Sequence, residues 1–215
     1  MKYKLVLVAV MSLTWLLMTA AAMAVPIPGM FNTGVDNSGS PLGNNVVDPH
    51  WVLSAGPQGT PTAITGDPRP PSWVANTATS RWVTPEVNGN TGVLAGTYVY
   101  DLTFNLTGFL PSTASISGMW ASDNNSSVFL NGALIATHVG GGTAFTAFDN
   151  FSTATGFLPG INTLTIQAVN AGGPAGVHVT ALVGDATPVP EPTSGLLTFT
   201  LASWALVRPG KRGSV

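Results

Sequence analysis

Between positions 98 and 106, every second side chain is large and apolar, and this run constrains the fold more than any other. These side chains are Tyr98, Tyr100, Leu102, Phe104 and Leu106, and they alternate with Val99, Asp101, Thr103 and Asn105. Because successive side chains of a strand point to opposite faces, the alternation indicates a strand with one buried face. Further runs of this kind follow at 113–120, 128–138 (two short runs around a turn), 162–169 and 177–183. Outside the two ends of the chain no window shows helical periodicity, so we expect an all-β fold.

The same alternation predicts which side chains form the core. The inward set is Ala114, Ile116, Trp120, Val128, Leu130, Leu164, Ile166, Ala168, Val177, Val179, Ala181 and Val183. Asn131-Gly132 is a hairpin-turn dipeptide, and a further strand is expected around 50–53. His178 alternates with Val177 and Val179, which predicts that it meets solvent or a hydrogen-bonding partner on the outer face.

The amino-acid composition excludes several kinds of functional site. The 215 residues include no cysteine, which excludes a disulfide framework, a thiolate metal site and a cysteine nucleophile. The fold must therefore rest on its own hydrophobic core, which a body of about 150 residues can supply. Only 7% of the residues are charged, against about 25% in an ordinary soluble protein.

The first 24 residues have the pattern of a signal peptide. Lys2 and Lys4 give a basic start, residues 5–18 are apolar, and Ala22 and Ala24 supply the small residues that signal peptidase requires. The apolar run is short for a membrane span of about 20 residues, which favours cleavage after Ala24 over an uncleaved anchor.

The other end carries a proline-rich motif followed by an apolar stretch and basic residues. The motif is Val189-Pro190-Glu191-Pro192, the apolar segment covers 195–207, and Arg208, Lys211 and Arg212 form the basic end. This arrangement resembles the PEP-CTERM sorting signal of Gram-negative bacteria. The resemblance covers residues 188–215 and implies recognition by an exosortase, transient association with the inner membrane, cleavage near the tripeptide, and delivery to the cell surface or extracellular matrix. The thirteen-residue apolar segment is shorter than the span that the family's pattern requires.

Removing both ends leaves a body, residues 25–187, with an acidic balance. It contains eight acidic and two basic residues, a formal charge of −6 with histidine neutral. Such a surface repels phosphates, so nucleic-acid binding is excluded as a function class.

Four segments of the body resemble a galactose-binding-like jelly-roll β-sandwich. They are Trp120-Ala121-Ser122-Asp123-Asn124, then 128–132, then 157–164, and finally Val169-Asn170 before the glycine-rich 172–176. The resemblance is best over 96–183 and implies a single all-β domain of a kind that often binds carbohydrate. It names no ligand, because function lies in the site and not in the fold.

Candidate site residues come from aromatic and polar side chains in predicted loops. Aromatic faces stack on sugar rings, so Trp51, Trp73 and Trp82, with Arg81 nearby, form a candidate carbohydrate platform. The alternative for each tryptophan is a place at an end of the core. Asp123 and Asn124 are candidate sugar ligands and offer oxygens for Ca²⁺, although a simple turn also suits them.

Known catalytic motifs are absent from the sequence, and the acidic residues mostly lie beside turn formers. We therefore predict an exported, non-catalytic protein that binds carbohydrate or packs against extracellular polysaccharide. Two alternatives stay open: a secreted glycan-active enzyme that uses Asp or Glu, and a structural matrix protein without a small ligand.

Overall fold

The structure, a computed structural model, describes residues 23–57, 64–65, 69–87, 91–138 and 143–190. Most of the predicted signal peptide, Ala22 included, and the sorting tail from Glu191 onward lie outside these residues, so both stay predictions. Among the described residues, no helix has the length and apolar character needed to cross a membrane.

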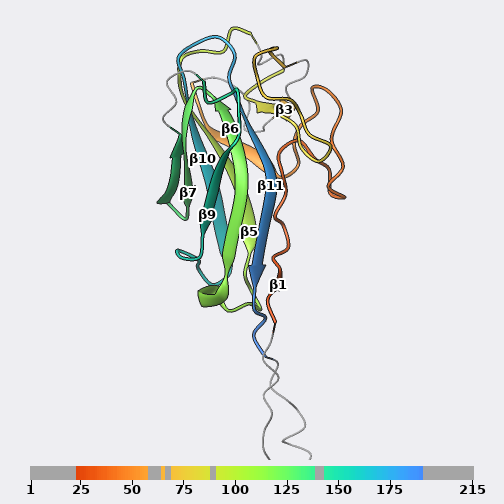
Figure 1. The fold of residues 1–215 in the computed structure, drawn as a ribbon, viewed down its shortest axis with the longest axis vertical. Coiled ribbons are helices and arrows are strands. Elements are labelled where there is room, and N and C mark those ends of the chain that lie inside the picture. The colour runs from red at the N-terminus through yellow and green to blue at the C-terminus, as the bar shows by residue number, and fades with distance from the viewer. Residues whose placement is uncertain (1–22, 58–63, 66–68, 88–90, 139–142, 191–215) are drawn as a thin grey trace, which may run out of the picture.

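Two antiparallel sheets form a jelly-roll β-sandwich, as predicted (Figure 1). The six-stranded sheet has the order β3–β4–β11–β6–β9, with β1 paired to β11. Its strands are β1 (Val25–Pro26), β3 (Ile64–Thr65), β4 (Val83–Thr84), β6 (Ser115–Asp123), β9 (Asp149–Thr153) and β11 (Gly176–Ala186). A single 3₁₀ turn, η1 (Pro111–Thr113), precedes β6.

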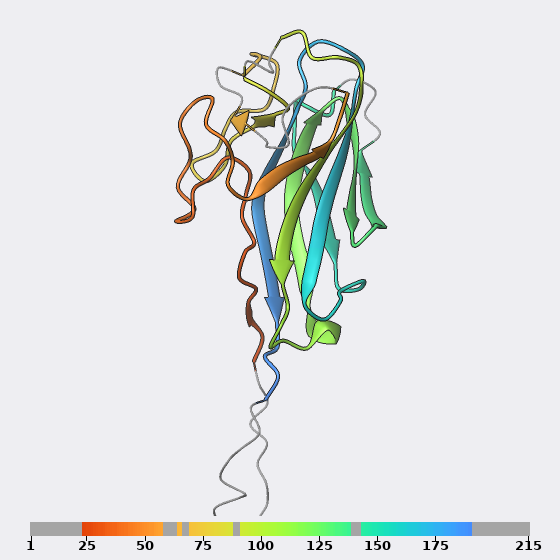
Figure 2. The same cartoon turned by 180° about the vertical axis from the view of Figure 1, so that it is seen from behind.

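The five-stranded sheet, seen from its own side in Figure 2, has the order β2–β5–β10–β7–β8. Its strands are β2 (Trp51–Ala55), β5 (Gly96–Asn105), β7 (Asn125–Leu130), β8 (Ala133–His138) and β10 (Ile161–Asn170). The longest pairing joins β5 to β10 over ten residues of each strand, from Asn105 opposite Ile161 to Gly96 opposite Asn170.

The predicted core of β5 and β10 is confirmed. The alternating apolar side chains of both strands are at most 3% exposed, including Tyr100, Leu164 and Ile166 at 0%. Burying side chains of this size contributes about 1.5–3 kcal/mol each, which lets the domain fold without disulfides. The Asn131-Gly132 hairpin is confirmed as well, because both residues have the positive φ angles (50° and 81°) of a two-residue β-turn.

The prediction for β11 is correct only for its first half. Val177 and Val179 are buried, but Val183 is 55% exposed and Leu182 takes the inward place. The register against β6 shifts between Thr180 and Val183, where Ala181 has a φ of 50°. This β-bulge inserts one extra residue and so reverses the faces of the rest of the strand.

The outer face of the six-stranded sheet is covered in part by a second layer. Segments 69–87 and 143–148 fold over it and enclose an apolar cluster of Trp73, Trp82 and Ala121, with Val74, Phe145 and Phe148 at its margin. As a result the first five residues of β11 are buried on both faces, His178 among them.

Both ends of the described body leave from the same pole of the sandwich (Figure 1). Val25 pairs with Ala186, and the Val189 amide donates to the Gly108 carbonyl at 2.8 Å. A chain attached through its C-terminal end would therefore hold this pole toward its anchor.

Candidate functional site

The tryptophans predicted as a sugar platform are buried, which corrects that expectation. Trp51 is 0% exposed in the main core, and its indole Nε1 donates to the Phe31 carbonyl oxygen at 3.0 Å. A ring enclosed on both faces offers no surface for stacking on a ligand. The alternative, that Trp51 completes the core, is the one that the structure supports.

Trp73 and Trp82 pack against each other under the second layer, with ring centroids 4.1 Å apart and exposures of 2% and 0%. Their indole nitrogens also bond within the chain. Trp73 Nε1 donates to Asp123 Oδ2 at 2.8 Å, and Trp82 Nε1 donates to the Val74 carbonyl at 2.8 Å. Both rings therefore attach the covering segment to the sheet and are closed to sugar.

The polar members of the predicted site also hold the fold. Asp123 is 5% exposed, and burial raises the pKa of its carboxyl although the Trp73 indole favours the charged form. Asn124 Oδ1 accepts from the Ala171 amide at 2.8 Å, and an Arg81 guanidinium nitrogen donates to Asn44 Oδ1 at 3.3 Å. Within the described ranges no three His, Cys, Asp or Glu side chains are grouped to hold a metal, and Asp123 and Asn124, the two candidate Ca²⁺ ligands, each accept a hydrogen bond from within the chain.

Ser80 and His178 form a hydrogen-bonded pair, Oγ to Nε2, at 2.8 Å. The pairing matches a nucleophile and its base, but both side chains are fully buried. Desolvation lowers the pKa of His178 to about 3, and the Arg69 charge acts in the same direction. Of the two roles expected for His178, the hydrogen-bonded one is confirmed. The face on which the side chain lies is covered by the second layer and is not exposed to solvent.

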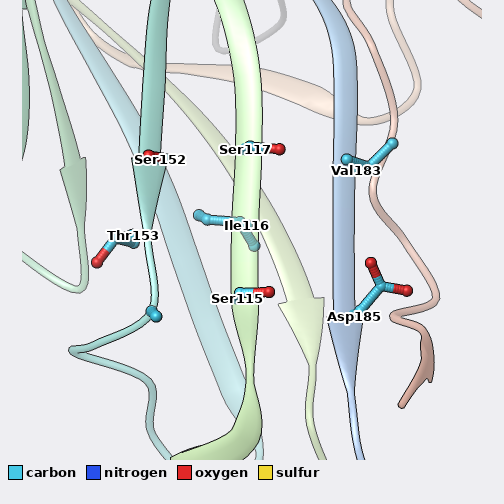
Figure 3. A pocket seen from close by; sticks show the side chains of 8 residues that line it. Ser115, Ile116, Ser117, Ser152, Thr153, Val183 and Asp185 are labelled. Atoms are coloured by element: carbon cyan, nitrogen blue, oxygen red, sulfur yellow. The ribbon is translucent and has the colours of Figure 1, made fainter. Parts of the chain in front are cut away.

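The lower half of the six-stranded sheet, below the second layer, carries an open hollow of about 450 Å³ (Figure 3). It is lined by Ser115, Ile116, Ser117, Ser152, Thr153, Ala154, Val183 and Asp185. The register explains why these residues meet. Ser117 pairs with Ser152 on one side and Val183 on the other, and Ser115 pairs with Asp185. We call this surface the serine hollow.

The serine hollow presents small hydroxyls, one carboxylate and the aliphatic side chains of Val183 and Ala154, with the buried Ile116 between the serines of β6. Ser115, Ser117, Ser152 and Asp185 are exposed, and Val183 is 55% exposed. No other side chain in the described part of the chain bonds to the Asp185 carboxylate. A surface of this kind can accept and donate several hydrogen bonds at once and still contact a C–H face.

Sequence reasoning missed the serine hollow for a specific reason. Val183 stands in the predicted inward set, and only the bulge at Ala181 turns Val183 and Asp185 outward. The available signal was Ser115 and Ser117 alternating with Ile116, but every half-exposed strand alternates in this way.

No known protein family and no curated protein matches the chain. Solved structures with some likeness include a lectin from Pleurotus ostreatus in complex with GalNAc, at 24% identity and a TM-score of 0.36, covering 46% of this chain. This chain spans only 29% of that lectin's length. A family 35 carbohydrate-binding module from Clostridium thermocellum aligns at 14% identity and a TM-score of 0.34, over 57% of this chain and 86% of the module. A cyclase from Fischerella sp. TAU aligns at 14% identity and a TM-score of 0.45, over 78% of this chain and all of the cyclase.

Proposed function

We propose that this protein is an exported, non-catalytic carbohydrate-binding protein of the cell surface or extracellular matrix, with the serine hollow as its binding site. The observation that carries the proposal is the lining of the hollow: exposed serine hydroxyls on two neighbouring strands beside the carboxylate of Asp185. Sugar hydroxyls both donate and accept, and a carboxylate accepts from two of them through stronger, charge-assisted bonds. Val183 supplies the apolar contact for the C–H face of a ring.

The charge of the body favours a neutral or amino-sugar glycan over a polyanionic one. The body has a formal charge of −6, and the hollow itself is lined by a carboxylate and no base. A polyanion would be repelled at this surface, most strongly at low ionic strength.

The single carboxylate in the hollow supports binding over turnover. Glycoside hydrolysis usually requires two carboxyl groups on either side of the scissile bond, and Asp185 is the one carboxylate in the lining of this hollow. The alternative hypothesis, a glycan-active enzyme, has no comparable support.

Export, sorting by an exosortase and release from the membrane are part of the same proposal. Their support is the N-terminal basic and apolar pattern and the C-terminal Pro-Glu-Pro motif with its apolar and basic flanks. Signal peptidase, exosortase and extracellular polysaccharide are the partners that these features imply.

A binding experiment on matched variants tests the site. Asp185→Asn should weaken binding of the preferred neutral oligosaccharide about tenfold, because it replaces a hydrogen bond to a charged acceptor (roughly 1.5–3 kcal/mol) by a neutral one (roughly 0.5–1.5 kcal/mol). Ser117→Val should weaken it as well, and Thr103→Val, an exposed change on the other sheet, should not. Calorimetric titration of the three variants measures the affinities, and unchanged affinity in both hollow variants would contradict the proposed site.

A further inference from the structure

A second polar hollow, of about 260 Å³, lies on the outer face of the five-stranded sheet. We call it the amide hollow. Four strands contribute to it: Thr97 from β5, Gln167 and Val169 from β10, Asn125, Ser126 and Ser127 from β7, and Thr137 and His138 from β8. The register brings them together, because Gln167 pairs with Ser127 and Ser127 pairs with Thr137.

Two of its side chains have a polar atom without a partner. Asn125 Oδ1 and His138 Nε2 are shielded from solvent, yet neither has a hydrogen bond in the described structure. The His138 Nδ1 contacts the Asp149 carboxylate of β9, so Nε2 is the ring nitrogen that is left without a partner. Each unpaired atom costs free energy, so Asn125 Oδ1 indicates a missing donor and His138 Nε2 a missing hydrogen-bond partner.

The missing partners fit a neutral, hydroxyl-rich molecule. The lining includes no lysine or arginine, so it offers no fixed positive charge to an anion. After a small rotation of either side chain, a sugar hydroxyl can donate to Asn125 Oδ1 and can donate to or accept from His138 Nε2, while Gln167, Thr97 and Thr137 can pair with the remaining hydroxyls. At about 260 Å³ the hollow is smaller than the roughly 300–1,000 Å³ typical of drug-sized ligands, which suits the end or side branch of a glycan.

The two hollows open on opposite faces and toward opposite poles of the sandwich. The serine hollow lies where Ser115 pairs with Asp185, close to the pole from which both ends of the body leave. The amide hollow includes Asn125, the first residue of β7. Strand β6, which ends just before Asn125, runs to the opposite pole in Figure 1. The core separates them, so a glycan segment in one hollow leaves the other free.

We infer that the amide hollow is a second site for a neutral sugar residue, and that the protein bridges two glycan chains by holding one on each sheet. This inference rests on the proposed function for the serine hollow. Bridging raises the apparent affinity for a polymer above that for either short fragment, because the second contact forms at a high local concentration.

Calorimetry with neutral tetrasaccharides of glucose, galactose, mannose or N-acetylglucosamine tests the inference on the full chain. We expect two equivalents of the best ligand per chain. Asp185→Asn with Ser117→Val should remove one equivalent, and Gln167→Leu with Thr137→Val should remove the other. Thr103→Val, outside both hollows, should keep two. Sedimentation of a long polymer of the same sugar should show cross-linked complexes for the unmodified chain and neither paired variant.

The outcomes separate the two proposals. One equivalent that only the serine-hollow variant removes would overturn the second site, with water alone in the amide hollow, and would leave the proposed function intact. One equivalent that only the amide-hollow variant removes would overturn the proposed serine site and the bridging. No binding to any tetrasaccharide would overturn both. The imidazole nitrogen resonances of His138 give an independent readout, because they should shift with added sugar only if the amide hollow is occupied.

Discussion

The imidazole of His178 lies between the rings of Trp82 and Phe148, at centroid distances of 5.4 and 4.9 Å. Its Nε2 bonds to Ser80, and its Nδ1 has no partner. Charging this ring would place a cation in an apolar cluster, which is why burial lowers its pKa to about 3. We therefore expect this buried side chain to make the attachment of the second layer sensitive to acid.

The first prediction at this scale is the pH dependence of stability. Unfolded His178 takes up a proton near pH 6.5, and the folded chain does so only near pH 3. The unfolded state therefore binds more protons between these values, and the free energy of unfolding falls as the pH falls through that window. Burial raises the pKa of Asp48 and Asp123, and these two groups act in the opposite direction near their ordinary pKa of 3.8.

His178→Gln isolates the effect, because every other titrating group stays in place. Urea unfolding at pH 7.5 and 4.5 should show that the unmodified chain loses about 2–3 kcal/mol more than the variant. Equal losses in the two proteins would show that this ring can charge without opening the cluster.

Single residues also show why the predicted site was wrong. Trp73 and Asp123 are 50 positions apart and form one hydrogen bond. The local composition predicted that both residues lie in loops beside charged residues. That prediction fits an exposed platform as well as a buried, hydrogen-bonded pair. Only the long-range folding of segment 69–87 over the sheet distinguishes the two arrangements, and no local pattern encodes it.

At the scale of the element, strands with regular pairing could be predicted and the irregular strand could not. In β5 and β10 a period of two runs unbroken, so the pattern alone identified the buried faces. In β11 the apolar residues Val177, Val179, Ala181 and Val183 also alternate. After the bulge, however, Leu182 faces the core in place of Ala181 and Val183. No glycine marks the positive φ at Ala181, so the usual signal of such a bulge is missing.

Ala181 provides the prediction for this element. Its left-handed backbone costs an alanine about 1–2 kcal/mol, and glycine avoids that cost while losing about 0.5–1 kcal/mol through the entropy of the unfolded chain. Ala181→Gly should therefore leave stability unchanged or raise it by up to about 1.5 kcal/mol. Ala181→Val should lower it, because a β-branched residue tolerates this region least.

Ala186→Gly is a control in the same strand, at a residue without positive φ, and it should be destabilising, because it loses a buried methyl group as well as chain entropy. Chemical unfolding of the three variants measures the differences. If glycine were equally unfavourable at 181 and 186, the bulge would not be where the structure has it.

At the scale of the whole molecule, the sequence predicted a single β-sandwich with processed ends, while the location of the candidate site came from the structure. Both hollows are built from small polar residues of neighbouring strands, which no motif marks. The processing of the ends stays a prediction, and the described body is compatible with it. Strand β1 begins at Val25, directly after the predicted cleavage site, and Val189, directly before the Pro-Glu-Pro tripeptide, is still bonded to the sandwich.

The last prediction follows from that arrangement. Cleavage after Ala24 and near Glu191 would keep the pairing of Val25 with Ala186 and the bond from Val189 to Gly108, so the trimmed chain should stay folded. Intact-mass measurement of protein released by its native host should give an N-terminus at Val25 and no residue much beyond Glu191. In a host without an exosortase, the uncleaved tail should keep the protein at the inner membrane, weakly because its apolar segment is short. A released form that still carries Arg212 would contradict the sorting tail, because the basic end of such a signal stays on the cytoplasmic side until the chain is cut.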